Sequence, residues 1–355
     1  MAVTSIPQHR AAPVAPPVPV ARRRMSTRIL GLLICAAAVA VLCFLSLAVG
    51  TRVTPLQAVW DAIVAYDPNN TDQLVIRELR VPRTILGVLV GAALGLAGAV
   101  MQGVTRNPLA DPGILGVNAG ASLLVVIGIS AFGVTSILGY VWFAFAGAAV
   151  ASIIVYSVAA LGREGATPVK LALSGAAISA AFGALTSAML LLDQATFDQF
   201  RFWAVGALAG RDMTIVAQIA PFLIIGCLLA LCLGRVLNTL SLGEDVARGL
   251  GANVALSRGV SAGAVVLLCG SATAACGPIG FVGLTIPHVA RMIVGPDYRW
   301  VLPYSMLLAP ILLLAADILG RVIARPGELQ VAIVTAFLGA PVFSALVRRK
   351  KLAEL

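Results

Sequence analysis

The chain has 355 residues, of which 60% are hydrophobic and 11% charged, and its mean hydropathy is +0.99. These values exclude an ordinary water-soluble globular domain and indicate a protein of the lipid bilayer. The net charge of +10 could suggest a nucleic-acid partner, but the basic residues flank apolar segments and form no continuous stripe. We interpret them as topology signals and expect membrane lipid, and no nucleic acid, around the chain.

The N-terminal segment is rich in proline and carries arginines at positions 22–24 and 28. An apolar stretch over 29–50 follows, which is longer than the apolar part of a signal peptide and long enough to cross the roughly 30 Å hydrocarbon core. We therefore predict a disordered cytoplasmic tail over residues 1–28 and a retained membrane span after it.

Apolar windows bounded by charges, proline or glycine predict about ten membrane-spanning helices within residues 29–348, and a short tail over 349–355. Basic clusters at both ends of the chain and the even number of spans place both termini in the cytoplasm. The predicted fold class is therefore all-α, a polytopic integral membrane protein. The expected spans are 29–50, 84–104, 114–132, 136–161, 169–192, 213–236, 256–275, 279–294, 300–320 and 329–347.

Several arginines break the topology rule, because this arrangement places Arg77, Arg80, Arg83, Arg321 and Arg325 on the outer face. One explanation is an acidic partner that docks from outside. The alternative is that these side chains reach lipid headgroups or pair locally. Local pairing is open to Arg321 in particular, since Asp317 lies one helical turn earlier.

Glycines at 87, 91, 95 and 98 form a smooth face on the second span, which predicts close helix packing. Two breaks rich in proline and glycine, at 107–113 and 276–280, end helices and permit a tight return of the chain near the membrane surface. Their similar placement in the two halves indicates a weak inverted repeat, a layout common among transporters.

The sequence holds no recognisable energy source for transport. None of its three lysines, Lys170, Lys350 and Lys351, follows a glycine, so a Gly-Lys-Ser/Thr phosphate loop is excluded. No acidic or basic residue lies near the centre of an expected span, where ion-driven carriers usually place one. The pattern contains no metal-ligand cluster and no hydrolase triad, so we predict no metal, no cofactor and no catalytic residue. His288, near a helix end, could touch a ligand but is more typical of a structural histidine.

An inner loop after the sixth span carries Glu244 and Asp245 at the start and Arg248 at the end of a possible one- to two-turn helix. Gly249 and Gly251 would close it. Such a helix on the inner face could transmit force from a soluble partner, or it could be an ordinary connecting loop.

Long segments of the chain resemble one family. The stretch from Arg80 to Ser122, RVPRTILGVLVGAALGLAGAVMQGVTRNPLADPGILGVNAGAS, is similar to the signature of the binding-protein-dependent ABC permeases that import iron-siderophore complexes and vitamin B12. The similarity continues through RFWAVGAL, SLGEDVARGLG, LCGSATAACGPIGFVGLTIPHVAR, AADILGRVIARPGELQ and TAFLGAPVFSALVRRK. It covers nearly everything after the tail.

The resemblance implies a type II ABC importer permease in the bacterial cytoplasmic membrane, without an ATPase site of its own. It implies a second permease subunit, identical or homologous, two cytoplasmic ATPase subunits, an extracytoplasmic binding protein and a ferric-siderophore cargo. Cobalamin and haem are alternative cargoes within the family. An ion-coupled secondary carrier and an intramembrane enzyme are the alternatives from other classes.

The resemblance also implies residue roles. Arg80, Arg83 and Arg321 would face acidic residues of the binding protein, with Asp317 and Glu328 orienting Arg321 and the start of the tenth span. The other two sets are the coupling helix with the ATPase, at Gly243, Glu244, Asp245, Ala247, Arg248, Leu250 and Gly251, and the cytoplasmic gate, at Asn107, Leu109, Thr167 and Pro168.

Overall fold

The structure is a computed structural model that describes residues 25–50, 54–161 and 167–348. The expected tails over 1–28 and 349–355 lie wholly or largely outside these ranges. Every regular element in the described part is helical. The ten apolar helices are α1 (Met25–Ala48), α4 (Val81–Thr105), α5 (Val117–Phe132), α6 (Ile137–Ala160), α7 (Pro168–Leu192), α9 (Met213–Cys232), α12 (Val254–Cys276), α13 (Val282–Val294), α14 (Tyr298–Ile323) and α15 (Val331–Arg348). The shorter elements are α2 (Leu56–Val64), α3 (Thr71–Val75), the π-helical η1 (Ile76–Arg80), the 3-10 helix η2 (Pro112–Leu115), α8 (Gln194–Ala204), α10 (Gly234–Ser241) and α11 (Glu244–Gly249).

Each of the ten expected spans corresponds to one apolar helix, which confirms the all-α membrane fold. Seven helices within the described ranges are long and apolar enough to cross a bilayer, with α3, η1 and α4 joined in one of them. The other three, α5, α13 and α15, are shorter. The span expected over 279–294 corresponds to α13, which has 13 residues and rises only about 20 Å. Positive φ at Gly277 and Phe281 delays its start.

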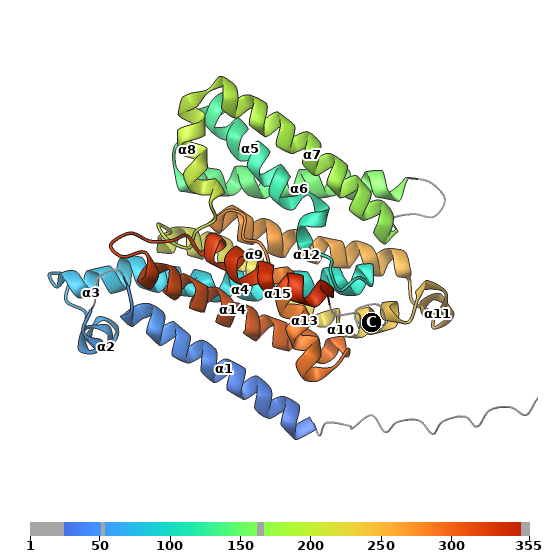
Figure 1. The fold of residues 1–355 in the computed structure, drawn as a ribbon, viewed down its shortest axis with the longest axis horizontal. Helices are drawn as coiled ribbons and strands as arrows, with labels where there is room; N and C mark the ends of the chain where they lie inside the picture. Colours follow the sequence, from blue (N-terminus) through green and yellow to red (C-terminus); the bar gives the residue numbers. More distant parts are fainter. Residues whose placement is uncertain (1–24, 51–53, 162–166, 349–355) are drawn as a thin grey trace, which may run out of the picture.

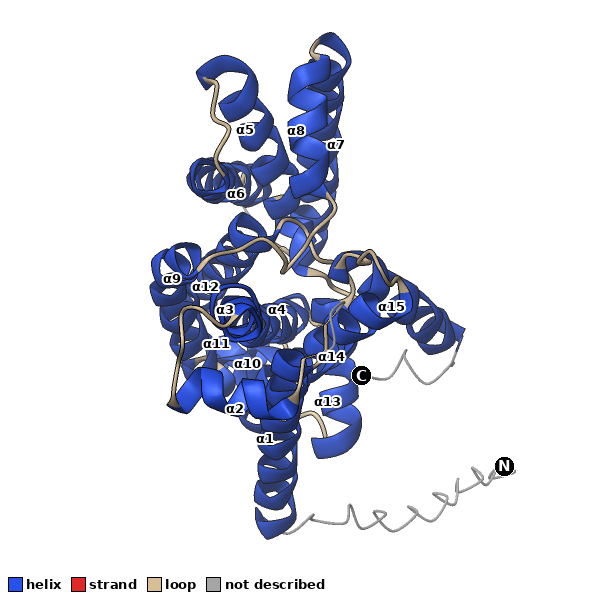
Figure 2. Cartoon of the chain, turned by 90° about the vertical axis from the view of Figure 1, so that its left-hand side faces the viewer, coloured by secondary structure: helices blue, strands red, loops and turns tan. Residues whose placement is uncertain are grey.

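The helices form three layers (Figure 1). A central layer contains α4, α9, α12 and α14, with α13 and α15 beside them. Helices α5 to α8 form a second layer on one side, and α1 alone packs along the opposite side, as the turned view in Figure 2 also shows. This arrangement leaves α1 and α7 largely exposed: only 11% of the apolar stretch of each is buried, against 83% for α4.

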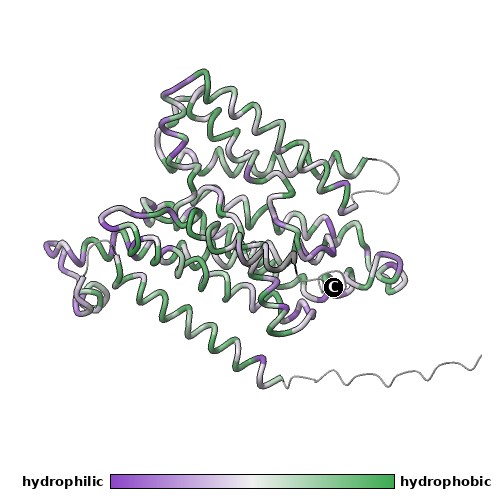
Figure 3. The backbone as a smooth tube through the Cα atoms, viewed as in Figure 1, coloured by the Kyte–Doolittle hydropathy of each residue, from purple (hydrophilic) through white to green (hydrophobic). Residues whose placement is uncertain are grey.

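Polar residues gather at the two ends of the molecule, with an apolar band between them (Figure 3). One end, here named the α3 end, carries α2, α3 and the last turn of α14. The other, the α11 end, carries α10, α11 and the turn between α13 and α14. An apolar belt between two polar ends is the arrangement that a bilayer requires.

Helix α4 is the centre of the core, and its glycine face confirms the packing that the sequence predicts. Gly91 and Gly95 lie against the backbone of α14 at Pro310 and Ser305. Gly98 comes closest, since a Cβ there would lie 1.8 Å from the carbonyl oxygen of Gly283 on α13. Helix backbones approach this closely only where both residues are small.

Candidate functional sites at the two ends of the bundle

Arginine side chains at the α3 end cap the C-terminus of α1. The last carbonyls of a helix have no partner within the helix, and they carry partial negative charge that attracts cations. Arg80 donates to the backbone carbonyls of Leu47 (2.6 Å) and Ala48 (2.9 Å). Arg321 donates to the carbonyls of Ser46 (2.9 Å) and Val49 (3.1 Å). Arg325 donates to the carbonyl of Gly50 (2.7 Å). These contacts fix the end of α1 against η1, which leads into α4, and against α14.

Helices α4 and α14 are also joined through the buried carboxylate of Asp317. Arg83 donates from Nη2 to Asp317 Oδ1 at 2.7 Å and from Nη1 to Glu328 Oε2 at 2.7 Å. Arg321 donates from Nε to Asp317 Oδ2 at 3.1 Å. Asp317 is 0% exposed and Arg321 1%, so the pair is cut off from solvent. Glu328 is the exposed member of the network.

The structure places all three expected docking arginines in one cluster and turns them inward. Arg80 and Arg83 are also buried, at 6% and 9% exposure. Arg321 makes the local pair with Asp317 that the sequence left open as the alternative. Docking of a partner at this cluster stays a prediction, and it requires the partner to compete with the internal acids.

The loop expected to couple to an ATPase forms the short helix α11 at the α11 end. Gly243 precedes it with φ +103°, a conformation that favours glycine. Ala247 is completely buried, whereas Val246 and Leu250 are 51% and 66% exposed. Helix α11 therefore presents apolar side chains to whatever covers this end.

Glu244 ties α11 to the core. Its carboxylate accepts a hydrogen bond from the buried Arg258 of α12 and lies 3.8 Å from Arg106 Nη2 at the end of α4. Arg248 of α11 itself lies 3.4 Å from the other carboxylate oxygen. Asp245, one residue along, points fully into solvent. Glu244 thus faces inward and links three helices. Arg258 is a partner of Glu244 that the sequence reading missed, although a basic residue inside an apolar span was the available signal.

The expected gate residues lie in two segments near the same end. Asn107 folds the connection after α4 by accepting a hydrogen bond from the Leu109 amide at 2.9 Å. Thr167 is the N-cap of α7, which Pro168 begins, and its hydroxyl accepts from the Lys170 amide at 3.4 Å. Side chains of α4 and α7 line one small cavity close by, together with Arg258. Their role as a gate stays a prediction.

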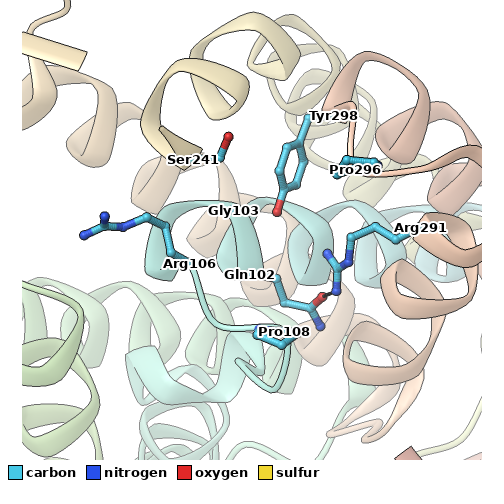
Figure 4. Close-up of a pocket in the computed structure, with 8 residues that line it drawn as sticks. All are labelled: Gln102, Gly103, Arg106, Pro108, Ser241, Arg291, Pro296 and Tyr298. Carbon is cyan, nitrogen blue, oxygen red and sulfur yellow. Dashed lines mark hydrogen bonds between the residues drawn. The ribbon is translucent and has the colours of Figure 1, made fainter. Parts of the chain in front are cut away.

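A second recess at the α11 end was not expected from the sequence. Gln102 of α4, Arg106 just after α4, Arg291 of α13 and Tyr298 of α14 line a cavity of about 170 Å³ (Figure 4). Arg291 donates a hydrogen bond to the Gln102 side-chain oxygen, while the Gln102 amide donates to the Leu284 carbonyl at 3.1 Å. No local sequence pattern predicts this site, because its members lie far apart along the chain.

Comparison with known proteins decides the family. Residues 38–349 match the FecCD transport family. The chain belongs to the FecCD transport family. It is 50% identical over 307 residues to the ferric enterobactin transport system permease protein of Escherichia coli (strain K12), covering 86% of this chain and 91% of that protein. It is 46% identical over 291 residues to an Fe(3+)-citrate import system permease protein of Bacillus subtilis (strain 168), covering 82% and 84%.

A solved structure agrees with this assignment. A metal-chelate type ABC transporter in an inward-facing conformation superposes with a TM-score of 0.79 at 28% identity, covering 91% of this chain and 99% of that one. This member of the FecCD family is therefore a multi-pass membrane permease of the ABC importer type. The resemblance that the sequence motifs carried is confirmed.

Proposed function

We propose that this FecCD-family chain is the permease subunit of an importer that moves ferric-siderophore complexes across the bacterial cytoplasmic membrane. The observation that carries the proposal is the 50% identity, over most of both chains, to a permease named for ferric enterobactin. Energy would come from two separate cytoplasmic ATPase subunits, and cargo from an extracytoplasmic binding protein. A second permease, identical or homologous, would complete the pathway.

The geometry at the α11 end supports an ATPase partner there. Val246 and Leu250 give α11 an exposed apolar face, which a soluble partner could cover. Glu244 would carry a displacement of α11 into α4 through Arg106 and into α12 through Arg258. Since Arg106 directly precedes Asn107 and lies three residues before Leu109, movement of α11 would reach the gate segment without a long relay.

The α3 end would receive the binding protein. Arg80, Arg83 and Arg321 gather here with the acids Asp72, Asp317 and Glu328, so an acidic partner would compete with these acids for the guanidinium groups. Glu328 is the accessible acid, and its bond to Arg83 could be exchanged for a bond to a carboxylate of the partner. This exchange reconciles docking with the buried position of the arginines.

Uptake by the reconstituted complex tests the function. We expect ATP-dependent accumulation of a ferric siderophore in vesicles that contain the permease pair, the ATPase subunits and the binding protein. Ferric catecholates, ferric hydroxamates, ferric citrate, haem and cobalamin would be compared side by side. Uptake of cobalamin or haem alone would contradict the cargo, and uptake that follows an ion gradient without ATPase would contradict the importer class.

A further inference from the structure

The recess at the α11 end holds a positive charge without a matching acid. Arg291 bonds to the neutral side chains of Gln102 and Tyr298. Figure 4 shows its guanidinium directed at Gln102 with the Tyr298 hydroxyl nearby, while Arg106 points away. Within the described part of the chain we find no carboxylate paired with Arg291. A half-buried guanidinium held among neutral groups favours binding of an anion.

The acids nearest to the recess are already engaged. Glu244 is bonded to Arg258 and Arg248, and Asp297 to Arg299 and Asn238. Gln102 cannot turn away, because its amide is fixed to the Leu284 carbonyl and its oxygen must then face Arg291. An acid that pairs with Arg291 would therefore have to come from outside the described fold.

The size of the recess limits what that charge can be. Its volume of about 170 Å³ is well below the roughly 300–1,000 Å³ of sites for small organic ligands. A carboxylate or phosphate group fits, whereas a nucleotide or a siderophore does not. The ligand is thus one anionic group.

The position of the recess favours a protein side chain over a lipid headgroup. Arg106, Ser241 and Pro296 are exposed at its rim, at the α11 end. Ser241 lies two residues before Gly243, and Arg106 is also the neighbour of Glu244 on α11. A subunit that covers α11 therefore lies over the rim as well.

We propose that this recess receives an acidic side chain of the cytoplasmic ATPase subunit, which pairs with Arg291. The proposal rests on the proposed function, since that function supplies the partner. It adds a charged anchor to the apolar contact made by Val246 and Leu250. Tyr298 and Gln102 hold the Arg291 guanidinium in place before the partner arrives.

The test measures the Kd between the ATPase subunit and the permease in nanodiscs of zwitterionic lipid, at several NaCl concentrations. Arg291→Gln removes the charge, and we expect the Kd to rise about tenfold or more, with a shallower salt dependence. Arg291→Lys should recover part of the affinity. Arg235→Gln, an exposed arginine on α10 outside the recess, is the matched control and should change the Kd less than about twofold.

A second variant guards against misfolding, because loss of Arg291 also removes a contact between α4 and α13. Gln102→Glu keeps that contact, strengthens it with charge and supplies the missing acid from within the chain, at the cost of the hydrogen bond to the Leu284 carbonyl. We expect it to weaken ATPase binding as Arg291→Gln does, while the new ion pair offsets the lost hydrogen bond and keeps the melting temperature close to that of the wild type.

Three results would overturn the proposal. One is an unchanged Kd in both Arg291→Gln and Gln102→Glu. The second is that Arg291→Gln only lowers retention of anionic phospholipid, seen by native mass spectrometry, and leaves the Kd unchanged. The third is that inorganic phosphate binds in the recess, seen as protection of Arg291 from modification by phenylglyoxal at constant ionic strength, while neither variant changes the Kd of the ATPase subunit. If the wild-type permease bound no ATPase subunit at all, the proposed function itself would fail.

Discussion

Asp317 on α14 accepts a 2.7 Å hydrogen bond from Arg83 on α4, although 234 positions separate the two residues in the sequence. The same carboxylate holds Arg321, so one buried acid balances two buried guanidinium groups. Asp317 and its two arginines therefore set how α4, α14 and the end of α1 meet at the α3 end.

Asp317→Asn should destabilise the subunit strongly. The substitution leaves two buried arginines without their shared counter-charge, and breaking a buried ion pair in this way costs about 3–5 kcal/mol. Thermal unfolding of the purified permease in detergent would measure the loss. Asp245→Asn, at a fully exposed position, is the control and should leave the melting temperature unchanged. Equal melting temperatures for the two variants would show that the network contributes little.

Glu328→Gln should strengthen binding of the substrate-binding protein. The variant frees Arg83 Nη1 from its exposed competitor, and a partially exposed pair of this kind is worth roughly a two- to fivefold change in Kd. Surface plasmon resonance at low salt would detect it, with Asp198→Asn on α8, also paired with an arginine, as the control. Weaker binding would mean that Glu328 itself contacts the partner.

Glu244→Gln should separate ATP hydrolysis from transport. The side chain faces Arg106 and Arg258 and not the exposed face of α11, so we expect the ATPase subunit to remain bound within about twofold. Uptake per ATP hydrolysed should fall, because α11 then moves without α4 and α12. Asp245→Asn should keep normal coupling. Val246→Asp, on the exposed apolar face of α11, is expected to abolish ATPase binding. If Glu244→Gln did the same, Glu244 would be a contact residue and not an internal link.

Gly98→Ala should loosen the core. The new Cβ would lie 1.8 Å from the Gly283 carbonyl oxygen, and relieving such overlap costs about 1–3 kcal/mol. The melting temperature in detergent should drop. Gly263→Ala on α12, where no atom lies within 4 Å of the added Cβ, should be neutral or slightly stabilising. A drop of the same size in both variants would contradict the packing explanation.

Acid should weaken one helix cap at the α11 end. Hydrogen bonds from Arg299 and then Asn238 lower the pKa of Asp297, the N-cap of α14, to about 2. Because the folded pKa lies below the unfolded value of about 3.9, the charge stabilises the fold fully above that value and the contribution is lost as the pH falls towards 2. The difference in melting temperature between wild type and Asp297→Asn should therefore shrink to about half near pH 3. A difference that stayed constant down to about pH 2.5 would contradict this assignment.

Hydropathy and local signals alone determined a large part of this protein. Long apolar windows must become helices in a bilayer, since no other local structure satisfies the backbone there, and all ten expected windows are helical. The short helix α11 was equally readable, because its acids, its arginine and its glycines lie within one turn or two of each other. Quoted motifs over most of the chain were enough to indicate the family.

Only the tertiary structure decided the contacts between distant residues. Nothing local shows that Arg80, Arg321 and Arg325 cap α1, or that Arg291 meets Gln102, because each pairing joins different helices. The short reach of α13 escaped prediction as well, since the residues before it are also apolar and hydropathy cannot detect the positive φ at Phe281. The sequence thus determined which segments enter the membrane, whereas packing decided which of their charges are already satisfied and which still need a partner.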